Sequence, residues 1–284
     1  MNLTSAPQVR KLLADHGLRP KKRLGQNFLI DRNVLERIVA ASGAREGVNV
    51  LEIGPGLGVL TKELADTGAR VVCVEADKAL IPILEDTLVG SAVEIINQDF
   101  LKVNLSEFIG KRGGGKWTVV GNLPYYITSP IITMLLDSKE IISSIVLMVQ
   151  REVARRLQAA PGTDDYGSLS VFVQYHCEIE SVMKVSKNVF YPVPDVDSEV
   201  VKLTMREKPA VAVCDEALFF RIVRAAFGKR RKTLLNALGS SAELGWDKEK
   251  AHLILAQAEI DENRRGETLS LDEFAALGTS AFQN

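Results

Sequence analysis

The fold is decided by the stretch VLEIGPGLGVLT at residues 50–61. It begins as an apolar run typical of a buried strand, breaks at three alternating glycines, and continues with the apolar spacing of a helix. Glycine accepts positive φ and has no Cβ, so a ligand can approach the backbone N–H groups where such a helix begins. The stretch therefore predicts a strand–turn–helix unit that binds a ligand at its glycine-rich turn.

The charge and spacing of this stretch indicate the kind of ligand. The fingerprint of dinucleotide-binding proteins needs its third glycine at position 59, which is Val59 here. Glu52 lies two places before Gly54 and would repel a pyrophosphate. A cationic ligand with a ribose, such as S-adenosylmethionine, fits that charge better. Taken alone, the stretch leaves a plain glycine-rich turn as an alternative.

Composition indicates the class of protein. The chain has 284 residues, of which 46% are hydrophobic, and this suits one large domain with a smaller one. No apolar run approaches the length of a membrane span, and the start lacks a signal pattern, so we expect a cytoplasmic protein. Its three cysteines and three histidines are scattered along the chain. They suggest neither a disulfide framework nor a metal site.

Basic residues are concentrated in two blocks, although the net charge is only −1. Residues 1–32 carry seven Lys or Arg against two acids, and residues 221–232 carry six with no acid. Blocks of one sign point to a polyanionic partner, although a charge run is often only a solvated surface. Nucleic acid is the favoured partner.

Apolar runs of strand type alternate with helical patterns along the first half of the chain. The predicted strands cover residues 48–53, 70–75, 92–97, 117–121 and 143–149. Such alternation predicts a parallel sheet with helices on both faces, and ligands of these sheets bind beyond the carboxyl ends of the strands. Four landmarks follow strands and should meet at that edge: Gly54, Glu75, Asp99 and Asn122.

Each landmark has a chemical interpretation. Glu75 comes about twenty residues after the first glycine, where a carboxylate commonly accepts hydrogen bonds from ribose hydroxyls. Asp99 could accept from an adenine amine, although capping a short helix explains it equally well. The side-chain oxygen of Asn122, together with a backbone carbonyl, could accept from the amine of a target adenine and free its lone pair.

Two aromatic side chains are candidates for stacking on a flipped base. Tyr125 ends the motif Asn122-Leu123-Pro124-Tyr125, and Phe190 begins a second proline-containing stretch. We expect the two rings to lie on opposite faces of the base. An ordinary loop and a rigid connector remain the alternatives for the two stretches.

Together these motifs resemble the rRNA adenine dimethyltransferases, from about Pro20 to about Leu277. The motifs that carry the resemblance are Leu24–Leu29, Glu52–Gly58, Glu75, Asp99, Asn122–Tyr125 and Phe190–Ser198. The segment Arg224–Leu238 resembles the enzymes of this family that act on the small subunit, the kasugamycin-sensitivity methyltransferases.

The resemblance implies an α/β fold with a Rossmann-like S-adenosylmethionine-dependent methyltransferase sheet of seven strands, the last of which form an antiparallel hairpin. A small C-terminal helical domain follows. We therefore expect an N-terminal helix and basic arm at 1–23, a methyltransferase domain at 24–206, and a helical RNA-binding domain at 207–284.

The resemblance also implies roles for individual residues. The expected cofactor-binding residues are Asn27, Leu29, Gly54, Glu75, Asp99 and Asn122, and the expected catalytic residues are Asn122, Tyr125 and Phe190. RNA-binding is expected of Arg224, Lys229, Arg230, Arg231 and Lys232, and no metal is expected. Val193 and Asp195 replace the usual proline and basic residue of the family, which weakens the case for an RNA contact by that loop.

The expected activity is methyl transfer from S-adenosylmethionine to the exocyclic amines of two adjacent adenines in small-subunit rRNA. The expected partner is an immature small ribosomal subunit, and the expected state is a monomer that binds no membrane. Three alternatives remain: a large-subunit rRNA adenine methyltransferase, a non-catalytic nucleic-acid-binding relative, and a nicotinamide oxidoreductase. The segment Arg224–Leu238, the intact Asn122–Tyr125 motif and the glycine spacing argue against them in turn.

Overall fold

The computed structural model describes residues 3–21, 24–229 and 231–284. The chain forms two compact units, of which the first contains Met1–Ala154 and Ile179–Met205 and the second contains Arg155–Glu178 and Arg206–Asn284. The sequence prediction placed residues 155–178 in the domain that spans 24–206. In the structure they group with the C-terminal helices, because Val171 and Tyr175 are buried in the same apolar cluster as Phe219.

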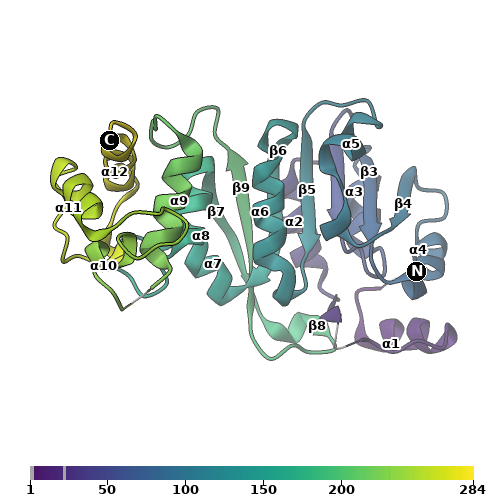
Figure 1. Cartoon of the computed structure of the whole chain (residues 1–284). Coiled ribbons are helices and arrows are strands. Elements are labelled where there is room, and N and C mark those ends of the chain that lie inside the picture. The colour runs from purple at the N-terminus through teal and green to yellow at the C-terminus, as the bar shows by residue number, and fades with distance from the viewer. Residues whose placement is uncertain (1–2, 22–23, 230) are drawn as a thin grey trace. The chain divides into compact units, whose positions relative to one another are not determined.

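A seven-stranded sheet forms the centre of the first unit (Figure 1). Its strand order is β4-β3-β2-β5-β6-β9-β7. The first five strands in this order run parallel, whereas β9 runs antiparallel to β6. The predicted seven-stranded sheet is therefore confirmed, and it is mostly parallel. The strands are β2 (Asn49–Ile53), β3 (Arg70–Glu75), β4 (Val93–Asn97), β5 (Trp117–Asn122), β6 (Ile142–Gln150), β7 (Cys177–Val185) and β9 (Ser198–Met205).

Helices cover both faces of the sheet because its central strands are apolar on both sides. On one face, α2 buries Val34, Leu35 and Ile38 against a cluster that includes Val50 and Val146 of the sheet. On the other face lies α6 (Figure 1). Asp31 caps α2 by accepting a hydrogen bond from the N–H of Val34. The helices that begin in the first unit are α1 (Ala6–Asp15), α2 (Arg32–Ser42), α3 (Val59–Asp66), α4 (Ile81–Thr87), α5 (Leu105–Gly110), α6 (Thr128–Asp137) and α7 (Arg151–Gln158).

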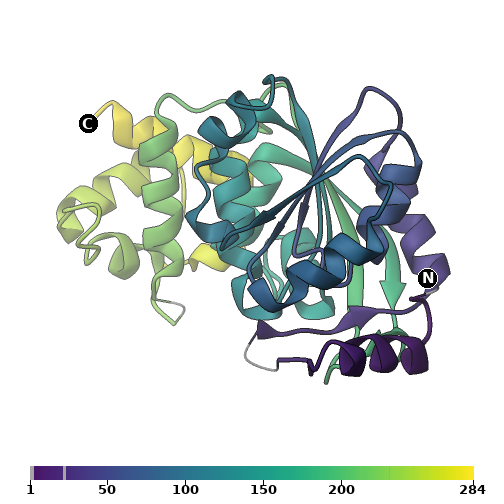
Figure 2. The same ribbon diagram turned by 90° about the vertical axis from the view of Figure 1, so that its right-hand side faces the viewer.

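A second, two-stranded sheet joins two distant motifs. Strand β1 (Phe28–Leu29) pairs antiparallel with β8 (Phe190–Tyr191), so that Leu29 lies opposite Phe190. Helix α1 lies beside this small sheet (Figure 2) and buries Leu12 and Leu13 in one cluster with Phe28. The pairing brings the stretch Leu24–Leu29 into contact with the proline-containing stretch that follows Phe190.

The second unit is helical and has an aromatic core. The ring centroid of Phe220 lies 5.1 Å from that of Tyr175 and 5.0 Å from that of Phe219. Gly266 allows close packing, since an added Cβ would lie 2.7 Å from the carbonyl oxygen of Ala226. The α-helices of this unit are α8 (Ser168–His176), α9 (Glu216–Phe227), α10 (Leu234–Leu238), α11 (Lys248–Gln257) and α12 (Leu271–Phe282). None of the helices in the described parts of the chain is long and apolar enough to cross a membrane.

Candidate active site

The glycine-rich turn after β2 has the backbone conformation that its sequence requires. Gly54, Gly56 and Gly58 all have positive φ, at 68°, 61° and 80°. A Cβ on Gly54 would meet no atom within 4 Å, so this backbone faces open space. A Cβ on Gly56 would lie 3.2 Å from the ring of Phe28. The first glycine therefore exposes backbone to a ligand, and the second also lets the segment that contains Phe28 pack closely.

A cavity of about 450 Å³ lies at the carboxyl ends of the strands. This volume is within the usual range for small-molecule sites. Most of its lining comes from the segment from Leu24 to Leu29, the glycine-rich turn, the ends of β3 and β4, and the motif that follows β5, and α2 adds Leu35 and Ile38. All six predicted cofactor-binding residues line it, namely Asn27, Leu29, Gly54, Glu75, Asp99 and Asn122.

Glu75 is buried at the end of β3 and is held by the backbone. Its Oε2 accepts a hydrogen bond from the N–H of Gly56 at 3.1 Å, and its Oε1 accepts from the N–H of Asp77 at 2.8 Å. Burial raises the pKa of this carboxyl group, and the backbone donors oppose that rise. Each carboxylate oxygen has a second lone pair, so Glu75 can also accept hydrogen bonds from ligand hydroxyls.

Asp77 connects the N-terminal segment to this end of β3. Lys21 Nζ lies 2.7 Å from its Oδ1, and Gln26 Nε2 lies 2.8 Å from its Oδ2. Burial disfavours ionisation of Asp77, but the hydrogen bonds from Lys21 and Gln26 outweigh it and lower the pKa. Lys21 of the predicted basic arm is therefore held in place by this ion pair. Lys22 and Arg23 lie outside the described residues.

Glu52 is the most buried acid of the cavity, with 2% of its surface exposed. Its Oε2 has no hydrogen-bond partner within the described part of the chain. The pKa of this carboxyl group is raised to about 8: desolvation is the main cause, the hydroxyl of Thr61 opposes the rise, and the charge of Glu75 adds to it. The unpaired oxygen fits a cationic ligand group.

Asn122 has a fixed side-chain orientation. Its Nδ2 donates to the carbonyl oxygen of Asn27 at 3.1 Å, and the Nδ2 of Asn27 donates to Gly25. Among the described residues, nothing donates a hydrogen bond to the Oδ1 of Asn122. The amide oxygen is therefore available to accept from a substrate amine.

Neither of the two aromatic residues that were expected to stack on a base lines the cavity. The hydroxyl of Tyr125 lies 3.1 Å from Ser198 Oγ, and burial raises the pKa of this phenol. Tyr125 is not among the residues that line the cavity, whereas the next residue, Tyr126, is. Phe190 is only 2% exposed and packs in the core with Leu29. Sequence reasoning missed Tyr126, because two adjacent tyrosines give no signal for which ring faces the cavity.

Asp99 begins the 3-10 turn Phe100–Lys102 and lines the cavity. Its Oδ1 accepts from the N–H of Leu101 at 3.1 Å, and the residue is exposed. Asp99 can therefore cap the turn and also accept a hydrogen bond from a ligand.

The basic segment of the second unit is partly neutralised. Arg224 Nε lies 2.8 Å from Glu243 Oε1, and Arg221 Nε donates to the carbonyl oxygen of Glu243 at 3.1 Å. Lys229 donates to Ser240 at 2.8 Å, whereas Arg231 and Lys232 are exposed. The fifth predicted RNA-binding residue, Arg230, lies outside the described residues. The acid that pairs with this block, Glu243, lies C-terminal to it, and the sequence alone does not show that these residues meet.

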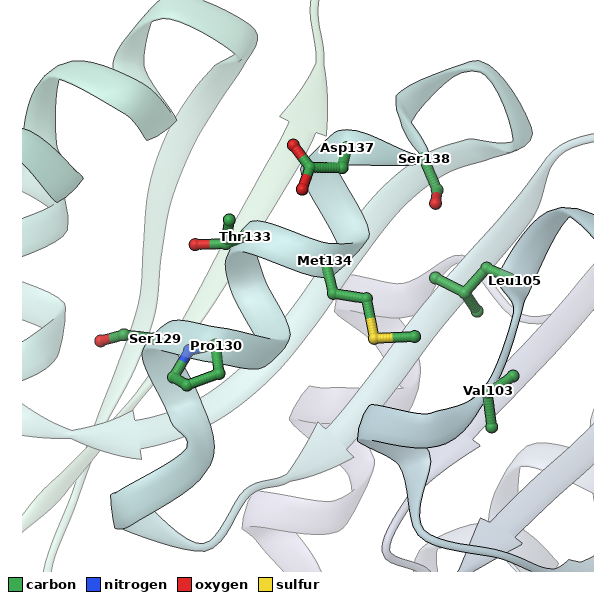
Figure 3. A pocket seen from close by; sticks show the side chains of 8 residues that line it. All are labelled: Val103, Leu105, Ser129, Pro130, Thr133, Met134, Asp137 and Ser138. Atoms are coloured by element: carbon green, nitrogen blue, oxygen red, sulfur yellow. The ribbon is translucent and has the colours of Figure 1, made fainter. Parts of the chain in front are cut away.

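A second depression of about 580 Å³ lies at the surface beside α6 (Figure 3). Met134 of α6 points toward Val103 and Leu105 across it. Asp137 is its only ionisable lining residue among those described, so it lacks the charged groups of the cavity at the sheet edge. No cluster of potential metal ligands occurs in residues 3–21, 24–229 and 231–284.

The site can now be compared with known proteins. The chain is 46% identical to the ribosomal RNA small subunit methyltransferase A of Clostridioides difficile, over 97% of this chain and 95% of that protein. It is 50% identical to the protein of the same name from Moorella thermoacetica, over 94% of each chain.

Solved structures agree with these relatives. A dimethyladenosine transferase from Plasmodium falciparum has a TM-score of 0.74 and 26% identity, and the match covers 88% of this chain and 95% of that one. The 23S rRNA methyltransferase ErmE has a TM-score of 0.67 and 28% identity, over 90% and 100%. The profile of the ribosomal RNA adenine dimethylase family matches residues 17–277. With this match over most of its length, the chain belongs to the ribosomal RNA adenine dimethylase family.

Proposed function

We propose that this chain transfers methyl groups from S-adenosylmethionine to the exocyclic amines of two adjacent adenines in small-subunit rRNA. The product is a pair of dimethyladenosines, made on an immature small ribosomal subunit. The names of its relatives and its family support this substrate. We expect the protein to act as a monomer in the cytoplasm.

The charge of the cavity is the observation that carries the proposal. Among the described residues, four acids and no Lys, Arg or His line it: Glu52, Glu75, Asp77 and Asp99. No described lining side chain offers a positive charge to a phosphate group, and the acids that are ionised, such as Asp77 with its lowered pKa, attract a cation. S-adenosylmethionine carries a sulfonium and an ammonium group and has no phosphate, so the residues present fit this cofactor.

Individual residues would hold different parts of the cofactor. Glu75 would accept from the ribose hydroxyls and Asp99 from the adenine amine. Gly54 would contact the methionine end through its exposed backbone, beside Asn27 and Leu29. When bound, the cofactor supplies an electrophilic methyl group on its sulfonium.

Asn122 would activate the amine of the target adenine. This amine is a poor nucleophile because its lone pair is delocalised into the ring. By accepting a hydrogen bond from the amine, the free Oδ1 of Asn122 would favour tetrahedral geometry and localise the lone pair. The loop that carries Asn122 is held in place, since Leu123 is buried and its N–H donates to Met148 O at 3.3 Å. The methylated amine is acidic enough to lose its proton to water, so the site needs no strong base.

Tyr125 and Phe190 would flank the target base. Because Phe190 is buried in the described conformation, this role requires its side chain to turn out of the core when RNA binds.

On the second unit, Arg231 and Lys232 are exposed and would contact phosphates. Arg224 would do so only in competition with Glu243. Lys229 and Arg230 complete the proposed RNA-binding segment.

Tritiated methyl transfer tests the proposal. The purified chain should label unmethylated small subunits, but not large subunits or free DNA. Labelling of large subunits alone would instead support the activity that the name of ErmE states.

Single-turnover rates with saturating cofactor and RNA then test the reaction centre. Asn122→Ala should bind RNA but transfer methyl slowly, and Asn122→Asp should retain more activity because it keeps an acceptor. Transfer by Asn122→Ala at the wild-type rate would contradict the proposed mechanism.

A further inference from the structure

Tyr126 is an exposed aromatic residue at the mouth of the cavity. It lines the cavity together with Asn122 and Pro124, yet 61% of its surface is accessible to solvent. Its neighbour Tyr125 is fixed by the hydrogen bond to Ser198. The side chain of Tyr126 has no hydrogen bond to any of the described residues. One of the two adjacent rings is therefore committed to the protein, whereas the other is open to a partner.

Gly25 of the N-terminal segment lies close to Pro124 and near the ring of Tyr126. An added Cβ on Gly25 would lie 3.1 Å from Pro124 Cβ and 3.9 Å from Tyr126 Cε1. Gly25 has a φ of 61°, which brings this backbone close to the loop without a side chain between them. The exposed ring of Tyr126 can present its face to a planar group.

We infer that Tyr126 stacks on the nucleotide next to the target adenine. The inference rests on the proposed function, in which a target base leaves its stack to reach Asn122. A flipped base leaves its neighbour with one uncovered face at the entrance of the site. Tyr126 is placed at that entrance and offers an aromatic ring that replaces the lost stacking partner.

The two adjacent target adenines give this contact a second consequence. While one adenine is in the cavity, the other is its neighbour and stacks on Tyr126. After methylation of one adenine, the RNA has to move so that the other enters the cavity, and Tyr126 then stacks on the nucleotide that lies beside it at the entrance. Tyr126 is therefore a positioning residue for the RNA, and the chemistry remains with Asn122.

Kinetics with three variants of Tyr126 test the inference. The KM for unmethylated small subunits and kcat are measured for the wild type and for Tyr126→Phe, Tyr126→Leu and Tyr126→Ala. The dissociation constant of S-adenosylmethionine is measured by calorimetry on the same proteins. Val89→Ala is the control, because Val89 is an 80% exposed apolar residue of the same unit that does not line the cavity.

Loss of the ring should raise the KM for the subunits by about 5-fold or more in Tyr126→Ala. Tyr126→Leu should recover little of it, because bulk without a π face stacks poorly, while Tyr126→Phe and Val89→Ala should behave as the wild type. Cofactor affinity should stay unchanged throughout. A wild-type KM for Tyr126→Ala would overturn the inference and leave the proposed function standing, and so would weaker cofactor binding with an unchanged KM. Absence of transfer by the wild type would overturn both.

Discussion

The substitution Glu52→Gln should remove a strong pH dependence of stability. Glu52 is 2% exposed, its Oε2 is unpaired, and burial raises its pKa from 4.5 to about 8. Glutamine keeps the shape of the side chain but has no proton to lose. The charged and titratable groups that face Glu52 are Glu75 and Cys73 of β3, and the hydroxyl of Thr61 comes from α3.

The sign of the effect follows from the two pKa values. Between pH 4.5 and about 8 the folded protein keeps the proton of Glu52, whereas the unfolded chain loses it. The stability that the neutral carboxyl contributes is complete below pH 4.5 and is lost as the pH rises through about 8. The slope is about 1.4 kcal/mol per pH unit, and the full effect is of the order of 5 kcal/mol.

Urea unfolding of the wild type and Glu52→Gln at several pH values between about 5.5 and 7.5 measures this slope. The pKa of Glu75 is also raised, so both proteins should lose stability with increasing pH. The wild type should lose about 2 kcal/mol more than the variant over this range. Equal slopes for the two proteins would show that Glu52 is ionised in the folded state and would refute the reasoning.

Three further substitutions test the cavity, the basic segment and the packing of the second unit. Glu75→Ala should weaken S-adenosylmethionine binding by about 10-fold or more in calorimetry, because a charge-assisted acceptor of the ribose is lost; wild-type affinity in a folded variant would contradict the assignment. Replacing Arg231 and Lys232 with Ala should flatten the salt dependence of RNA binding by about one unit per lost phosphate contact, and an unchanged slope would leave these residues as solvated surface. Gly266→Ala should lower the free energy of unfolding by about 1–3 kcal/mol, since its Cβ would lie 2.7 Å from a backbone oxygen of α9. Gly110→Ala, where an added Cβ meets nothing within 4 Å, is the control and should not lower that free energy.

The central sheet could be predicted from sequence because its strands are buried on both faces. The expected strands at 70–75 and 117–121 differ from β3 and β5 by at most one residue. Their continuous apolar runs and the polar residues that follow them are local signals. Strand β7 gave no such signal because polar residues interrupt its apolar ones, and much of Cys177–Val185 is exposed or half-buried. The two-residue strands β1 and β8 are too short for any periodicity.

The site was predictable to the level of the sheet edge, but its polar contacts were not. The rule for carboxyl ends of parallel strands brought Gly54, Glu75 and Asn122 together in advance. The ion pairs of Asp77 with Lys21 and of Glu243 with Arg224 join residues far apart in sequence. Formal charge along a chain cannot show which charges meet after folding.

Because β1 pairs with β8, the two-stranded sheet can form only late in the synthesis of the chain. Residues 30–189 lie between the two strands, so Phe28 and Leu29 leave the ribosome long before Phe190 and Tyr191. Contacts of such long sequence separation form late, because closing a long loop is entropically unfavourable. The wall of the cavity that contains Leu29 thus lacks its partner strand while most of the sheet is being made. A nascent chain can complete this wall only after the stretch that carries Phe190 has been translated.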